Sequence, residues 1–110
     1  MTDTRVVLVT APEQEVAVRL CHTLLTEGLI ACGNIVPGVT SVYRWEGSVK
    51  EDSEVLAILK TGSGCVGELI RRVAELHPYE VPEALVLNVD AGLEPYLNWV
   101  TRETGPRESS

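Results

Sequence analysis

Side chains that could bind a metal ion or a small ligand are concentrated in two segments of this 110-residue chain. The first segment, residues 30–47, combines a thiol and an amide with two aromatic rings, and the second, residues 75–83, combines an imidazole, a phenol and carboxylates with two prolines. Their members are Cys32, Asn34, Tyr43 and Trp45 in the first, and His77, Tyr79, Glu80 and Glu83 in the second. We expect any functional site to lie where the two segments meet.

Cys32 has two interpretations. A free cysteine in a strand is most often a small buried hydrophobic residue. As a soft ligand, its thiolate would instead suit copper or zinc. No second cysteine stands at metal-ligand spacing, so no closed zinc site is indicated.

His77 is the better placed of the two histidines. Pro78 restricts its backbone to an extended conformation, and the tyrosine and glutamates follow at once. Three extended residues cover about 10 Å, so His77 and Glu80 share a metal ion only if the loop turns. The alternative is structural: the imidazole caps a helix end or bonds a neighbouring carbonyl group. His22 falls on the polar side of a predicted helix, where we expect it to be solvated.

Catalytic equipment is not indicated. The sequence contains no P-loop, no dinucleotide-binding glycine pattern and no zinc-protease motif. A Cys32–His77 dyad would require the fold to bring the two together. Cys21 lies on a predicted core stripe, whereas Cys65 begins a helix, where it is either activated by the helix dipole or an incidental surface thiol.

Composition narrows the function classes. Nine basic against sixteen acidic residues give a net charge of −7, which argues against nucleic acid and against an anionic membrane surface as partners. An odd cysteine count and the lack of a signal-like N-terminus favour a reducing compartment, and we expect a cytoplasmic protein. We expect one domain over residues 1–104 and a flexible tail over 105–110.

Hydrophobic periodicity predicts the elements that position the two segments. A β-branched run over 5–10 suits a strand buried on both faces. Helices are predicted to begin at Pro12 and near Cys65, the second ending at His77. Ser63 could cap this second helix, after a loop at 61–64. Further strands are predicted over 30–36, 39–46, 49–60 and 84–90, and a last helix over 93–103.

The resulting order predicts an α+β fold. Its first six elements, βαββαβ, match the ferredoxin-like plan of an antiparallel sheet with both helices on one face, followed here by an extra C-terminal helix. The long central hairpin, with a bend at Pro37-Gly38 and a turn at Gly47-Ser48, exceeds what a compact monomer needs. Because open sheet edges must be covered, we expect Tyr43 and Trp45 to pair with a neighbouring chain in a homo-oligomer. Alternatively, they cover their own sheet.

At these residues the chain resembles the CutA family of divalent-cation tolerance proteins. The resemblance covers roughly residues 6–101. The matching pieces are Leu29-Ile30-Ala31-Cys32, the run from Asn34 to Gly47, Glu51-Asp52-Ser53-Glu54, the run from Glu75 to Glu83, and Pro95-Tyr96-Leu97-Asn98-Trp99. Gly33 departs from the bulkier residue, such as Val, expected after the motif cysteine, and widens the space near Cys32.

The resemblance implies a ferredoxin-like homotrimer, similar in assembly to the PII signalling proteins, and association with copper and other divalent cations. Together with the residues, it predicts a non-enzymatic protein that binds copper or another divalent ion in the response to metal ions. The predicted ligands are Cys32 and His77, supported by Glu80 or Glu83 and placed at a subunit boundary. Residues expected in a cleft or between subunits are Asn34, Tyr43, Arg44, Trp45, Lys60, Tyr79 and Trp99.

Two alternatives stay open. In a PII-like sensor, inter-subunit clefts would bind a small metabolite, with Arg44, Lys60, Trp45 and Tyr79 lining an anion or aromatic pocket. In a purely structural trimer, the motif residues would serve assembly alone.

Overall fold

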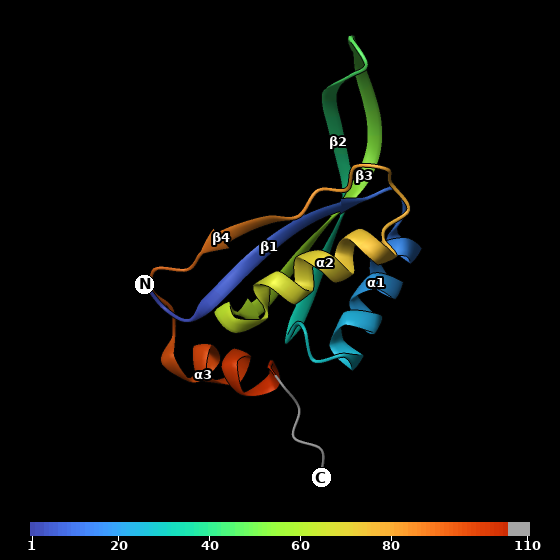
Figure 1. Cartoon of the computed structure of the whole chain (residues 1–110). Coiled ribbons are helices and arrows are strands. Elements are labelled where there is room, and N and C mark those ends of the chain that lie inside the picture. The colour runs from blue at the N-terminus through green and yellow to red at the C-terminus, as the bar shows by residue number, and fades with distance from the viewer. Residues whose placement is uncertain (106–110) are drawn as a thin grey trace.

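The structure is a computed structural model that describes residues 1–105, so the predicted tail lies outside the described residues apart from Gly105. Figure 1 shows an α+β protein in which helices cover one face of an antiparallel sheet, as predicted. The elements are β1 (Thr4–Ala11), α1 (Gln14–Thr26), β2 (Cys32–Trp45), β3 (Ser48–Gly62), the 3-10 turn η1 (Ser63–Cys65), α2 (Val66–Leu76), β4 (Leu85–Asn88) and α3 (Glu94–Glu103).

The sheet has the strand order β2-β3-β1-β4, with every neighbouring pair antiparallel. Side chains alternate between its faces, so Val7 and Val9 of β1 and Leu59 of β3 point toward α1 and α2 and are fully buried. Val6 and Leu8, on the other face, are only partly buried. The expectation that this strand is buried on both faces is therefore not met within one chain, because none of the helices within residues 1–105 covers the second face.

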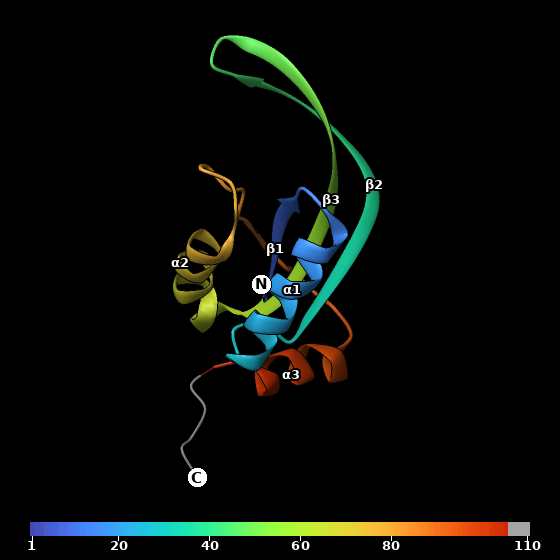
Figure 2. The ribbon, with the colours of Figure 1, turned by 90° about the vertical axis from the view of Figure 1, so that its right-hand side faces the viewer.

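The central hairpin is as long as predicted. β2 and β3 pair from Cys32–Lys60 to Trp45–Ser48, with a register shift between Val36 and Val39 at the predicted bend. Gly38 has a φ of +75° there, which a glycine adopts without strain. The turn falls on Glu46-Gly47, one residue before the predicted position. In Figures 1 and 2 the outer half of the hairpin extends well beyond the rest of the sheet.

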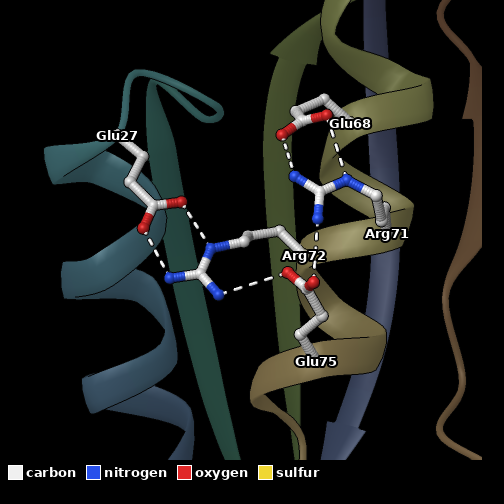
Figure 3. A network of polar contacts seen from close by, with 5 residues as sticks. All are labelled: Glu27, Glu68, Arg71, Arg72 and Glu75. Atoms are coloured by element: carbon white, nitrogen blue, oxygen red, sulfur yellow. Dashed lines mark hydrogen bonds and ion pairs between the residues drawn. The ribbon is translucent and has the colours of Figure 1, made fainter.

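Helices α1 and α2 are joined at the surface by a network of ion pairs (Figure 3). Arg72 donates two hydrogen bonds of 2.7 Å to Glu27, which follows α1, and a third to Glu75. Arg71 is bonded to Glu68 and, at 2.8 Å, to Glu75 of its own helix. Both arginines lie off the buried side of α2, which carries Leu69 and Val73. The paired geometry of Arg72 links the two helices on the side away from the core.

The start of α2 differs from the prediction. Thr61 and Gly62 belong to β3 rather than to a loop, and Ser63 does not cap the helix, because its hydroxyl donates to the Asp3 carboxylate instead. Cys65 is buried, which excludes the alternative of a surface thiol. The end of the helix is as predicted: α2 stops at Leu76, and His77 is extended ahead of Pro78.

Helix α3 crosses the end of the sheet opposite the hairpin (Figure 1) and buries Val100 completely. Within residues 1–105, no helix is long and apolar enough to cross a membrane.

Candidate functional site

A cleft of about 560 Å³ lies between the outer half of the hairpin and the loop that joins α2 to β4. Figure 2 shows the hairpin arching over this loop. The two segments singled out from the sequence thus meet, as expected. The lining residues are Thr10, Ser41, Val42, Tyr43, Trp45, Asp52, Glu54, Tyr79, Glu80, Val81 and Glu83.

Two phenol–carboxylate hydrogen bonds organise the cleft. The Tyr79 hydroxyl, from the loop, donates to Glu54 of β3 at 2.6 Å and thereby ties the loop to the hairpin. The Tyr43 hydroxyl donates to Asp52 within the hairpin. Burial, together with the bond to Glu54, raises the pKa of Tyr79, and the bond to Asp52 raises the pKa of Tyr43. Both phenols therefore stay protonated donors at neutral pH.

His77 is buried beneath this loop and has no ring nitrogen free. Its Nε2 lies 2.7 Å from the Thr10 carbonyl oxygen, and its Nδ1 accepts a hydrogen bond of 3.1 Å from the Tyr79 amide. Because Nδ1 is the acceptor, the proton of the neutral ring is on Nε2, which donates to Thr10. The ring also packs on that of Tyr79 at a centroid distance of 4.6 Å. Of the two predictions made for His77, these contacts match the structural one, in which the imidazole bonds a neighbouring carbonyl group.

Glu80 and Glu83 both face the cleft. Glu80 is exposed and Glu83 is half-buried. Burial raises the pKa of Glu83, and the negative charge of Glu54 adds to this. The carboxylates are dispersed: within residues 1–105, no three His, Cys, Asp or Glu side chains lie close enough together to hold a metal ion.

Cys32 lies apart from His77. Cys32 pairs with Lys60 of β3. His77 bonds the carbonyl group of Thr10, and Thr10 pairs with Leu56 of the same strand. Four residues of strand separate these positions, which is about 13 Å along the sheet. A dyad of Cys32 and His77 is therefore not formed within one chain.

Cys32 has polar neighbours of its own on the open face of the sheet. Its sulfur lies 3.7 Å from Asn34 Oδ1, which also accepts a hydrogen bond from Lys60 Nζ. The space beside Gly33 opens toward the helices and not toward Cys32, because alternation turns neighbouring residues to opposite faces. The sulfur of Cys21, a buried residue as predicted, occupies it.

Of the remaining residues predicted to lie in a cleft, some line it and others lie elsewhere. Tyr43, Trp45 and Tyr79 line the cleft, while Arg44 and Lys60 do not. Trp99 belongs to α3, where its ring packs against Tyr96 at 5.6 Å, at the far end of the molecule (Figure 1).

Sequence reasoning missed Asp52 and Glu54 as cleft residues. The signal was present in the hairpin pattern, since Ser41 pairs with Asp52 and Val39 with Glu54, so both carboxylates share the face of Tyr43. Applying the alternation to the return strand as well as to the first would have identified them.

Comparisons of sequence and of structure with known proteins all identify the same family. Residues 5–103 match the family described as CutA1 divalent ion tolerance protein. The "Divalent-cation tolerance protein CutA" of Thermus thermophilus is 48% identical over 100 residues, a match that covers 91% of this chain and 97% of that protein. A "Protein CutA, chloroplastic" of Arabidopsis thaliana is 43% identical over 99 residues, 90% of this chain but 54% of that protein. A solved structure of the divalent cation tolerance protein (Cut A1) from Thermus thermophilus superposes with a TM-score of 0.90 at 47% identity, covering 93% of this chain and 99% of the other.

Proposed function

The chain belongs to the CutA1 divalent ion tolerance protein family, and from this membership we propose that it binds divalent or soft metal ions, copper first, in the response to metal ions and without catalysing a reaction. The observation that carries the proposal is the half-exposed Cys32 thiol beside Asn34 on the edge strand β2. A thiolate next to an amide oxygen is a soft donor with room for further ligands, which suits copper.

The remaining ligands come from another protomer in this proposal. Because Cys32 and the loop lie about 13 Å apart along the sheet, a site that combines them joins Cys32 of one copy with Glu80 or Glu83 of the next. His77 can join as a ligand only by giving up one of its two backbone bonds, that of Nε2 to the Thr10 carbonyl or that of Nδ1 from the Tyr79 amide. Its first role in the proposal is to hold the loop that carries the two glutamates.

A homotrimer would supply this boundary. The open face of the sheet supports self-association, since it carries the partly buried Val6 and Leu8 and the exposed Leu85 and Leu87. The outer hairpin adds an exposed apolar side chain at Val49 (68% exposed). Apolar surface of this kind on an unpaired sheet marks an interface between chains. Analytical ultracentrifugation tests the trimer directly.

The metal proposal is tested by calorimetric titration of the metal-free protein with Cu²⁺, repeated with Zn²⁺, which has no redox chemistry with a thiol. We expect a saturable site with fixed stoichiometry per chain. It should be lost in Cys32→Ser and weakened in the Glu80→Gln, Glu83→Gln double variant. Cys65→Ser, which removes a buried thiol elsewhere, is the matched control. Copper affinity retained in a Cys32→Ser, His77→Ala double variant would overturn the proposal.

A second candidate is a PII-like trimeric sensor that binds a small metabolite, and the 560 Å³ cleft favours it. Because Arg44 and Lys60 do not line the cleft, an anionic metabolite is disfavoured. A thermal-shift screen of small molecules separates this candidate from the metal proposal, since a bound ligand stabilises the folded protein. In a purely structural trimer, Trp45→Ala would dissociate the assembly and no ligand would raise its melting temperature.

We propose a cytoplasmic location, because all three cysteines are free and free thiols persist in a reducing compartment. Fractionation of cells that express the tagged protein tests this location.

A further inference from the structure

The cleft combines aromatic rings with carboxylates. Tyr43, Trp45 and Tyr79 supply the rings, and Trp45 and Tyr43 remain 38% and 40% exposed. The carboxylates are those of Asp52, Glu54, Glu80 and Glu83. No lysine, arginine or histidine is among the described residues that line the cleft. This lining attracts positive charge and offers π faces on which a cation can rest.

The size and spread of these groups argue against a single metal ion. A cleft of about 560 Å³ lies in the size range of sites for small organic ligands. Within residues 1–105, no three potential ligand side chains converge on one point. The carboxylates therefore fit a cation whose positive charge is distributed along its length.

The hydrogen bonds inside the cleft leave acceptor capacity for such a ligand. Asp52 and Glu54 each accept a hydrogen bond from one phenol. An ionised carboxylate offers about four acceptor positions, so both can accept further donors. Glu80 adds an exposed carboxylate on the loop side. Donors can thus be bound from the hairpin and from the loop at the same time.

We propose that this cleft binds an aliphatic polyammonium ion, a diamine or polyamine, which is a ligand class beyond the metal ions proposed above. The ammonium groups bond the hairpin carboxylates on one side and Glu80 and Glu83 on the other. The methylene chain between them lies across Trp45 and Tyr79. Charge-assisted hydrogen bonds give the attraction its strength, and the aromatic rings select a ligand with an apolar middle over a hydrated metal ion.

Calorimetric titration with spermidine tests the proposal, on the metal-free 110-residue protein at fixed ionic strength. We expect one saturable site per chain. The affinity should fall about tenfold in the Glu80→Gln, Glu83→Gln double variant, because charge-assisted bonds are lost. A Glu15→Gln, Glu51→Gln double variant is the matched control: it removes two negative charges from exposed positions outside the cleft lining and should change the affinity less than twofold.

Tryptophan fluorescence gives a second readout. Spermidine should change the emission of the wild-type protein and leave that of Trp45→Phe unchanged, since the remaining Trp99 lies on α3, away from the cleft. Equal weakening by both charge variants, or Mg²⁺ binding as tightly as spermidine, would show general attraction to an acidic surface and overturn the proposal. So would the absence of saturable binding up to millimolar spermidine.

The outcome is separable from that of the metal proposal. Cys32→Ser should abolish copper binding and leave spermidine binding intact, because Cys32 does not line the cleft. Loss of spermidine binding in Cys32→Ser would also count against the polyammonium site. If the copper titration shows no saturable binding, the spermidine titration still tests the polyammonium site independently.

Discussion

The sulfur of Cys21 fills the space that a side chain at position 33 would need. A Cβ at Gly33 would lie 2.5 Å from Cys21 Sγ and 3.4 Å from Leu59 Cδ2. Burial raises the pKa of the Cys21 thiol, and the proximity of Cys32 adds to this effect. Gly33 and Cys21 thus act as a complementary pair, one providing the space between helix α1 and strand β2 and the other filling it.

Gly33→Val should therefore destabilise the protein, by about 1–3 kcal/mol, because added methyl groups in a packed interior force strain. Cys21→Ala makes room, so the double variant should be more stable than the sum of the two single changes predicts. Urea unfolding of all four proteins at one concentration gives the coupling free energy. Strict additivity would contradict the contact.

Glu46→Asn should stabilise the hairpin turn. Glu46 and Gly47 have φ values of +48° and +80°, and asparagine followed by glycine is the preferred sequence when both turn residues have positive φ. We expect a gain of about 0.5 kcal/mol, in the range of backbone effects at such positions. Gly47→Ala should act in the opposite direction. Thermal unfolding by circular dichroism measures both, and a loss of stability in Glu46→Asn would refute this account of the turn.

His77→Gln should cost about 1–3 kcal/mol of unfolding free energy, because the Thr10 carbonyl or the Tyr79 amide is left without its partner. His22→Gln, at an exposed position of α1, is the matched control and should change little. Denaturant unfolding checks both variants. If His77 acts only as a metal ligand, the metal-free His77→Gln protein should instead be as stable as the wild type.

Glu83 should make stability depend on pH. Burial and the charge of Glu54 raise the pKa of Glu83, so the folded state holds this proton more tightly than the unfolded state. The stabilising contribution of the protonated form is complete below the pKa of the unfolded chain and is lost as pH rises through the raised folded pKa. Relative to Glu83→Gln, the wild type should lose stability as pH rises from the pKa of an unperturbed glutamate, about 4.3, through the raised folded pKa. Unfolding curves for both proteins across this range test the sign, and parallel pH profiles would count against it.

Much of the fold could be predicted because its signals are local. Pro78 ended α2 at Leu76, with His77 extended, and the alternating residues of 39–46 formed an outer strand. The meeting of the hairpin with the loop at 77–83 was also expected, since both segments were dense in polar and aromatic side chains. The cap at Ser63 failed because a distant residue, Asp3, took its hydroxyl. A local sequence pattern does not reveal that a distant side chain competes for the same hydroxyl group.

Local sequence signals were enough for the element order, the α+β class and part of the chemistry-bearing groups, with Asp52 and Glu54 missed, because propensities, prolines and hydrophobic periodicity act over a few residues. Which of those groups meet depended on the folded chain. Strand register placed Cys32 about 13 Å along the sheet from Thr10, the residue whose carbonyl group His77 bonds. Packing placed both ring nitrogens of His77 in hydrogen bonds with backbone groups. The arch of the hairpin brought Asp52 and Glu54 to face Tyr79. Register, curvature and packing depend on residues far apart in the chain, so they lie beyond what residue spacing can predict.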